Sequence, residues 1–512
     1  MITDKELDFV REALEMARRF GASKARATLS KSEEDLVATL DGEVDRVTHC
    51  ADRSLNLALF VDGRFGTYST NKLDAVSLEG FIERAVATTR MVSEDVFRDL
   101  PDPARCCQDA LTGDELGLVD AVRERRSPAE RQQIALDASV LFSSRSGQLP
   151  PGTSFGPHRF AVPPLTMPRV GPPEKHVFTG YPRVARFPEA VPAAEKTDNS
   201  GPELPWSNHY EDEGKDFQIV SEEGEYSDSI YETVVMDTNG VCCRHRETSF
   251  DYGVEITVES GGDKYSGYWW DACSHAAGLN AVACGRRALE RAVAQIGSAP
   301  APSGRYTAVI DSEMAAKLVS PLLRALSAYS IQQNNSFLMD SLGKQVFPEG
   351  LTILDLPRIP GQTCSKYFDS EGVATVEAPI IERGVVKEYF VNTYMANKMQ
   401  IAPTIEDATR PKVLPWPEAG LDRAAILQRC GKGILVTDFN GGNSNPVTGD
   451  FSYGIEGFLF DQGRIVRPVS GMLMTGNLLS LWSKLLVAGD DARSCMTKLI
   501  PTLAFAKVDF SG

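Results

Sequence analysis

Histidine is the side chain most often used for acid–base chemistry near neutral pH and for binding zinc, and this sequence contains six histidines. They are His49, His158, His176, His209, His245 and His275. A zinc-protease helix needs two histidines on one face and a glutamate that activates water. No histidine here is followed by glutamate, and no two are close enough in sequence to share one helix face. The sequence therefore contains no recognisable zinc-binding helix.

The stretch that comes closest to a cluster of polar residues is NGGNSNPVTGDFSYGIEG at residues 440–457. Its glycines permit close approach of the backbone, and its acidic and hydroxyl side chains supply acceptors and donors. One hypothesis is a loop that lines a cleft, with Thr448, Gly449, Asp450 and Ser452 as the candidate lining residues. The other interpretation, which we favour, is a turn-rich connection between two strands.

Nucleophilic catalysis by serine or cysteine needs a nearby base, and the few histidines leave few candidates. No G-x-S-x-G motif occurs, and the glycines do not follow the pattern of a phosphate-binding loop. A self-sufficient hydrolase that uses Ser452 near Asp450 is kept as an alternative hypothesis. The ten cysteines show no C-x-x-C spacing, which predicts free thiols in a reducing compartment.

One helix of special interest is predicted to begin at Ser320. The Ser320 side chain can accept a hydrogen bond from a free N–H of the first turn, and Pro321 follows where a missing N–H costs least. Apolar residues then recur at helical spacing, namely Leu322, Leu326 and Tyr329. The polar run at 332–336 predicts a loop after this helix. An earlier helix is predicted from Asp311, after a buried strand at 305–310.

The N-terminal third predicts one helix followed by an antiparallel meander. Thr3 or Asp4 can cap a first helix that ends near Gly21. Alternating apolar residues then run from 25 to 70, interrupted by two Asp-Gly pairs at 41–42 and 62–63 that favour hairpin turns. A helix at 78–92 completes an N-terminal α+β domain, for which we predict the bounds 1–113.

The remaining chain predicts further helices and strands around an unusual central segment. Helices are predicted over 114–141, with a second helix starting at Pro128, and over 276–296. Strands are predicted at 227–236, 241–247 and 248–260, and strand–turn–strand units at 374–391 and 454–468. Thirteen prolines lie between Pro150 and Pro205. Because proline removes donors and fixes φ, this segment is predicted to be neither a central strand nor a long helix. Its many aromatic residues favour partly ordered packing over a neighbouring surface.

These elements predict an α+β fold with largely antiparallel sheets. We expect a middle region at 114–300, which contains the Pro-rich insertion at about 143–224, and a C-terminal domain at 301–512. This last domain is predicted to hold a mixed, largely antiparallel sheet with helices.

Composition narrows the functional class. The chain has 512 residues and a formal net charge of -17, which disfavours nucleic acid as a partner because phosphates are held by lysine and arginine. The N-terminus lacks the apolar core of a signal peptide, and no run of about 18 apolar residues predicts a membrane span. We therefore expect a cytoplasmic protein with no membrane partner.

Four separated blocks of sequence occur in a fixed order: FLMDSLGKQVFPEGLTI at 337–353, FDSEGV at 368–373, NPVTGDFSYGIEGF at 445–458 and GNLLSLW at 476–482. Together they resemble the TldD/TldE family, and more specifically its TldE (PmbA) branch, long described as modulator of DNA gyrase. The N-terminal meander resembles that family as well. The second block adds Asp369, Glu371 and Gly372 to the candidate cleft-lining residues.

The resemblance implies a division of labour between two kinds of subunit. TldD-type subunits of that family carry a zinc-binding H-E-x-x-x-H motif, whereas TldE-type subunits lack it and pair with TldD in a heterodimeric metalloprotease. Arg324, Ala325 and Tyr329 stand at the positions of the two histidines and the glutamate. The resemblance therefore implies a non-catalytic chain without a metal, a zinc-bearing TldD-type partner, and peptides or unfolded protein as substrate. A non-enzymatic homodimeric interaction protein is the remaining alternative.

Overall fold

The chain begins with helix α1 (Asp4–Arg19), which starts where its first N–H groups find acceptors. The Thr3 side chain accepts a hydrogen bond from Glu6 N, and the Glu6 carboxylate accepts one from Thr3 N. Helix α2 (Ala75–Thr89) is capped by Asp74, whose side chain accepts a hydrogen bond from Ser77 N. Buried apolar residues of α1 and α2 pack together on the first strands. The structure is a computed structural model that describes residues 1–146 and 216–512.

Three strands form the predicted meander, β1 (Lys24–Leu40), β2 (Glu43–Val61) and β3 (Arg64–Thr70). The two Asp-Gly turns connect them, and all four turn residues have positive φ: 49° at Asp41, 81° at Gly42, 50° at Asp62 and 69° at Gly63. Asparagine, aspartate and glycine tolerate this region of φ best, so the local sequence alone specifies both hairpins. The predicted helix, meander and turns are confirmed.

The meander continues into strands from much later in the chain. Strands β4 (Gln218–Asp237), β5 (Cys242–Ser260) and β6 (Asp263–Cys273) extend one antiparallel sheet with the order β3-β2-β1-β4-β5-β6. The link is an antiparallel pairing of β1 with β4 that runs from Arg26–Asp237 to Leu40–Glu223. Residue 113, where we predicted a domain boundary, therefore lies between strands of a single sheet. The packing predicted for 150–205 lies outside the described residues.

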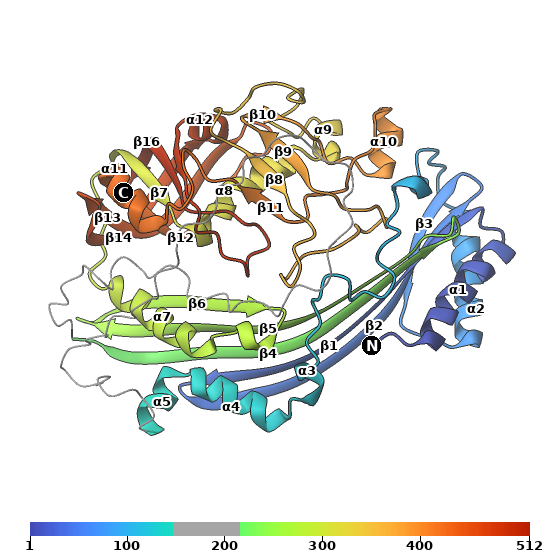
Figure 1. Cartoon of the computed structure of the whole chain (residues 1–512), viewed down its shortest axis with the longest axis horizontal. Helices are drawn as coiled ribbons and strands as arrows, with labels where there is room; N and C mark the ends of the chain where they lie inside the picture. The colour runs from blue at the N-terminus through green and yellow to red at the C-terminus, as the bar shows by residue number, and fades with distance from the viewer. Residues whose placement is uncertain (147–215) are drawn as a thin grey trace.

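Helices cover one face of this sheet, and the C-terminal part of the chain lies over the other (Figure 1). Leu29 and Val37 on β1 pack under helices, whereas Val235 and Cys243 point to the opposite face and contact Phe368. The covering helices beyond α2 are α3 (Val122–Arg125), α4 (Pro128–Ala138), α5 (Val140–Ser146) and α7 (Ala281–Ala294). No helix in the described ranges is long and apolar enough to cross a membrane.

The prediction of a helix over 114–141 is wrong for residues 114–121. Residues 114–117 form a turn, and an extended segment at 118–120 then lies beside β5, where Thr248 N donates a hydrogen bond to Leu118 O at 3.0 Å. Gly113 and Gly117 have φ values of 86° and 60°, which end any helix at these points. The predicted start of a helix at Pro128 is confirmed, with Ser127 as its cap. The helix predicted from Ala276 begins at Ala281 instead, because Asn280 caps it there.

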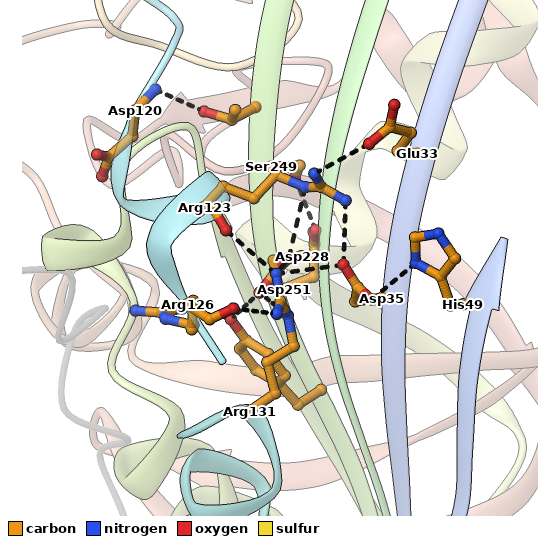
Figure 2. Close-up of polar contacts among 12 residues, drawn as sticks. Glu33, Asp35, His49, Asp120, Arg123, Arg126, Arg131, Asp228, Ser249 and Asp251 are labelled. Carbon is orange, nitrogen blue, oxygen red and sulfur yellow. Dashed lines mark hydrogen bonds and ion pairs between the residues drawn. The ribbon is translucent and has the colours of Figure 1, made fainter. Parts of the chain in front are cut away.

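Two arginines attach α3 and α4 to the sheet (Figure 2). Arg131 donates from Nε and Nη2 to the two carboxylate oxygens of Asp228, at 2.8 and 2.9 Å. Arg123 donates from Nη2 to Asp35 Oδ2 at 3.2 Å, and the Tyr226 hydroxyl donates to Asp228 at 2.9 Å. Asp228 is 0% exposed. Arg131 and Tyr226 therefore donate to this buried carboxylate, and Arg123 Nε lies 3.5 Å from it, so that both helices are fixed on the sheet.

The C-terminal body is built on a second six-stranded sheet, ordered β14-β13-β12-β7-β16-β15, in which an extra β14–β16 pairing closes five strands into a ring. Its strands are β7 (Gly304–Ile310), β12 (Lys432–Ser444), β13 (Asp450–Asp461), β14 (Arg464–Asn477), β15 (Leu485–Ala488) and β16 (Leu503–Ser511). The β7–β12 pair is parallel and the others are antiparallel. This mixed sheet and the antiparallel first sheet confirm the α+β class.

A small antiparallel sheet and several helices complete this body. The small sheet has the order β10-β9-β8-β11, with β8 (Ile353–Asp355), β9 (Ala378–Glu382), β10 (Val385–Val386) and β11 (Pro411–Val413). The helices are α8 (Ser312–Ala325), α9 (Ala328–Gln332), α10 (Thr393–Met399), α11 (Arg423–Cys430) and α12 (Leu478–Trp482).

Helix α8 corrects the prediction of a helix start at Ser320. A single helix runs from its Asp311 cap to Ala325 and contains Pro321 in its interior. Proline there removes one backbone hydrogen bond. The apolar face of α8 is fully buried in the C-terminal core, including Leu318 and Leu322. Burial of this face outweighs the lost hydrogen bond, so the helix continues through the proline.

Buried charges join the C-terminal body to the first sheet. Arg493 lies 3.6 Å from Asp271 of β6 and 3.5 Å from Glu313 of α8. Arg291 of α7 donates to Glu313 at 2.6 Å. The Arg493 guanidinium also stands over the ring of Trp269, 4.5 Å from its centroid. These contacts connect α7, β6 and α8, which are separate elements in the sequence.

Replacement of Arg131 by methionine should destabilise the fold strongly, because the carboxylate of Asp228 would stay buried with only part of its donors. We expect a loss of roughly 3 kcal/mol in the free energy of unfolding, measured by urea titration. Arg11→Met is the matched control, since Arg11 pairs with Asp8 on the surface, and it should cost less than about 1 kcal/mol. Equal losses in the two variants would contradict this account.

Candidate functional site

The three positions implied by the resemblance lie where α8 gives way to α9. Helix α8 ends at Ala325, and α9 begins after Ser327, where Ala328 N donates to Phe390 O at 2.9 Å. Ala325 is 3% exposed, whereas Tyr329 on α9 is 57% exposed. The single helical face predicted from Leu322 to Tyr329 is therefore interrupted at Ser327.

The side chains at these positions do not fit a zinc ion. The guanidinium of Arg324 is cationic and offers no lone pair, and the methyl group of Ala325 is buried and offers none either. Tyr329 carries only a phenol, which is not one of the imidazole, thiolate or carboxylate groups that bind zinc in proteins. Over residues 1–146 and 216–512, no three His, Cys, Asp or Glu side chains come together in an arrangement that could hold a metal ion.

The loop that follows α9 is organised around the hydroxyl of Tyr389. This buried oxygen accepts hydrogen bonds from Ser341 N at 2.8 Å and Leu342 N at 3.1 Å, and it donates to Leu338 O at 3.1 Å. The Ser336 hydroxyl donates to Ala325 O at 2.6 Å and so ties the same loop to the end of α8. The first family block thus forms a fixed loop beside the α8–α9 junction.

The turn between β12 and β13 packs against this loop. Phe337 N donates to Pro446 O at 3.0 Å. A Cβ on Gly449, which has a φ of 79°, would stand 3.2 Å from the Phe337 ring, so glycine is required there both by conformation and by space. Residues 440–444 and 450–457 belong to strands β12 and β13, so the predicted loop is much shorter than 440–457. The interpretation as a connection between strands is the one that fits.

Thr448 and Asp450 hold the turn together with Asn477, which caps α12. The Thr448 hydroxyl donates to Asp450 Oδ2 at 2.7 Å. Asn477 Nδ2 donates to Asp450 Oδ1 at 2.9 Å and to Thr448 O at 2.8 Å. These hydrogen bonds hold the pKa of the exposed Asp450 carboxyl below its ordinary value. Asp450 therefore acts as an ionised acceptor that fixes the turn.

Ser452 lies two residues along β13 and is exposed. In the part of the chain that the structure describes, its hydroxyl makes no hydrogen bond to Asp450 or to a histidine. The described histidines have other neighbours: His49 bonds to Asp35, His245 faces Glu247 and His275 bonds to Ser274. The described residues therefore assemble no base beside Ser452, and the alternative of a serine nucleophile gains no support from geometry.

The acidic residues of the second family block bind backbone groups. Asp369 Oδ1 accepts hydrogen bonds from Glu371 N at 2.9 Å and Val373 N at 3.0 Å. Glu371 Oε2 accepts from the backbone N and the hydroxyl of Thr393, at 2.9 and 2.8 Å, at the start of α10. Both carboxylates are buried. They stabilise the tight turn at 369–373 and the helix beside it.

This acidic turn is packed against the first sheet. Gly372 has a φ of 84°, and a Cβ there would stand 3.2 Å from Val241. Cys107 N donates to Gly372 O at 2.9 Å, and Ala374 N donates to Arg105 O at 2.9 Å. Burial, with the nearby charges of Glu406 and Glu371, raises the pKa of Asp369 to about 7.

The predicted site residues therefore fall into two groups. Ala325, Thr448, Gly449 and Asp450 are linked through the loop at 336–343 into one surface, whereas Asp369, Glu371 and Gly372 attach to α10 and the first sheet. Sequence reasoning missed Tyr389 and Asn477. Asn477 could have been found as a helix cap before LLSLW, but Tyr389 lies in no recognisable local pattern.

Large apolar side chains are exposed on the surface that joins α9, the loop and the turn. They are Tyr329, Met339, Leu342 and Val447, which are 57%, 43%, 51% and 51% exposed. We call these four residues the apolar rim. Solvent-exposed apolar side chains gathered beside one feature mark surfaces that contact another molecule.

Comparisons with known proteins indicate the same family along the chain. Residues 303–512 match the PmbA/TldA metallopeptidase C-terminal domain, and residues 188–296 match the central domain of the same family. A metalloprotease PmbA homologue from Haemophilus influenzae is 24% identical over 507 residues, which cover 98% of this chain and 94% of that protein.

Solved structures show the same fold. A putative modulator of DNA gyrase from Bacteroides thetaiotaomicron is 30% identical, covers 100% of both chains and superposes with a TM-score of 0.81. TldE from Thermococcus kodakarensis is 16% identical, with a TM-score of 0.71 over 98% of this chain and 100% of that one, a likeness that concerns the fold alone. Fold and comparisons together define a metalloprotease-like protein. The chain belongs to the PmbA/TldD family.

Tyr389→Phe should loosen the loop at 336–343, because Leu342 N loses its acceptor and Ser341 N keeps only its longer bond to Leu338 O, at 3.3 Å. We expect a cost of about 1–3 kcal/mol in local stability, measured by hydrogen exchange at the amides of Ser341 and Leu342. Tyr329→Phe removes an exposed hydroxyl and is the control, for which exchange should not change. Unchanged protection in Tyr389→Phe would refute the role assigned to this oxygen.

Asp369→Asn should change how stability depends on pH. Because the folded pKa of Asp369 is raised from 3.8 to about 7, the folded protein holds a proton that the unfolded chain releases between these values. The free energy of unfolding of the wild type therefore falls as pH rises through this window, by at most about 4 kcal/mol from this group. Asn should remove that fall while its amide oxygen keeps the bonds to the turn.

The control for this titration is Asp450→Asn. The pKa of Asp450 is lowered, so this group is ionised in both states above about pH 5, and the difference from the wild type should be flat up to pH 8. A difference between wild type and Asp369→Asn that is equally flat from pH 5 to 8 would show that Asp369 does not titrate in this range.

Proposed function

We propose that this protein is a non-catalytic, TldE-like subunit of a cytosolic zinc metalloprotease that acts on peptides or unfolded segments. The observation that carries the proposal is the α8–α9 junction. At the positions where the resemblance places zinc ligands and a general base, this chain has a guanidinium, a buried methyl group and an exposed phenol. None of the three can hold zinc at neutral pH or take a proton from a bound water.

The rest of the α8–α9 surface supports a scaffolding role. Polar side chains here form hydrogen bonds to backbone groups and so fix the shape of the loop and the turn. They are Ser336, Tyr389 and Asn477. A fixed surface of this kind suits a chain that completes an enclosed cleft for a catalytic partner. In this proposal a TldD-type subunit binds zinc and supplies the reacting groups.

The apolar rim supports docking of that partner beside the α8–α9 junction. Its side chains lie on α9, on the loop and on the turn, which follow the positions of Arg324 and Ala325 or pack against the loop. Covering them in a heterodimer would remove apolar surface from water and place the catalytic motif of the partner near this surface.

The protein purified alone should contain far less than one zinc per chain and should show no chelator-sensitive peptidase activity. The measurement is metal analysis by mass spectrometry, together with hydrolysis of an unfolded protein substrate with and without a zinc chelator. One zinc per chain together with turnover in the absence of any other protein would overturn the proposal.

Co-purification from the native cell distinguishes the proposed subunit from an interaction homodimer. We expect a tagged chain to retain a protein that carries H-E-x-x-x-H, and the double variant Met339→Asp, Leu342→Asp to lose it. Val76→Asp places the same charge on an exposed apolar residue of α2 and should retain the partner. Recovery of this chain alone, as a homodimer, would favour the interaction protein instead.

A further inference from the structure

A group of buried cysteines lies where the acidic turn meets the first sheet. Cys106, Cys107 and Cys243 belong to one buried cluster with Val241 and Phe368. Cys243 is on β5, whereas the other two are on the extended segment after α2. The proposed function does not involve these thiols.

Two of the three cysteines are in direct contact. The Cys243 thiol donates a hydrogen bond to Cys107 O at 3.2 Å, although 136 residues separate the two cysteines. The backbone holds this approach in place, because Arg244 N, next to Cys243, donates to Ala110 O at 2.8 Å. Backbone hydrogen bonds between this segment and β5 therefore hold the contact.

The pair is also asymmetric in its acidity. The hydrogen bond from Cys243, with backbone N–H groups and the charge of Arg358, lowers the pKa of Cys107 to about 6. The same hydrogen bond and burial raise the pKa of Cys243. Burial and Asp237 raise the pKa of Cys106 to about 11, so this neighbour stays a thiol. Cys107 is thus the thiolate of the group, and Cys243 holds the proton beside it.

We propose that Cys107 and Cys243 form a redox-active dithiol that a small hydroperoxide oxidises to an intramolecular disulfide. Both residues are almost fully buried, which excludes a bulky oxidant. The Cys107 thiolate attacks one peroxide oxygen, the O–O bond breaks, and hydroxide leaves, so that Cys107 becomes a sulfenic acid. The Cys243 sulfur then attacks Cys107 Sγ, the S–O bond breaks, and the hydroxyl leaves as water with the Cys243 proton.

The disulfide would act on the junction between the two parts of the protein. The segment that carries Cys107 also binds the acidic turn, through Cys107 N to Gly372 O and through Arg105 O to Ala374 N. A covalent bond from Cys107 to β5 would hold this segment, and with it the acidic turn, on the sheet. Oxidation would thereby stiffen the attachment of the C-terminal body.

The test treats the folded full chain with hydrogen peroxide, removes the peroxide, and then unfolds the protein in urea with N-ethylmaleimide to block the remaining thiols. The peptides are mapped without reductant. We expect a Cys107–Cys243 linked peptide pair that disappears on reduction. Cys107→Ala and Cys243→Ala should each abolish it, whereas Cys106→Ala and Cys242→Ala, the adjacent-residue controls, should keep it. In Cys243→Ala, dimedone added together with the denaturant should label Cys107 as a trapped sulfenic acid.

The wild-type map alone can overturn the proposal, even if a variant fails to fold. Cys50 and Cys242 are exposed and report whether the oxidant reached the protein. Oxidation of these two residues, with Cys107 and Cys243 both recovered as maleimide adducts, would refute the dithiol. A disulfide through Cys106 in place of Cys107 would refute the assignment of the nucleophile.

Discussion

The start of α8 is fixed by buried charges, and much of the C-terminal body depends on this constraint. Asp311 caps the helix through Glu313 N and pairs with Arg423, and Glu313 in the first turn pairs with Arg291 and Arg493. Although burial opposes it, Arg423 and Arg291 hold the pKa of Asp311 below its ordinary value, so the cap is ionised. Because the partners come from α7, α11 and the segment before β16, one cluster sets how the helix enters the core.

From this fixed start, α8 runs through the core to the surface. Its apolar face is buried strongly enough to continue through Pro321, and it ends where Ser336 and Phe390 take up the free backbone groups. The α8–α9 junction, the loop around Tyr389 and the turn held by Asn477 then follow as one connected surface. The blocks of sequence that carry the family resemblance therefore act here as supports for backbone shape.

A second junction, on the other side of the C-terminal body, has a different character. There the acidic turn and the cysteine cluster meet the sheet through backbone hydrogen bonds and close packing of small side chains around Gly372. This junction contains groups whose protonation or oxidation can change, namely Asp369 and the pair of Cys107 and Cys243. The charged junction at α8 fixes the fold, and the junction at 369–373 holds its chemically responsive groups.

The sequence by itself determined the features that depend on neighbours along the chain. Thr3 caps α1, Asp-Gly pairs turn the meander, alternation marks the strands, and the missing lone pairs at Arg324 and Ala325 can be stated without coordinates. Tertiary structure alone decided the pairing of β1 with β4, the passage of α8 through Pro321, the role of Tyr389 and the separation of Asp369 from Asp450. The reason is physical: caps and turns are set by short-range hydrogen bonds, whereas these features depend on burial and contacts between residues far apart in sequence.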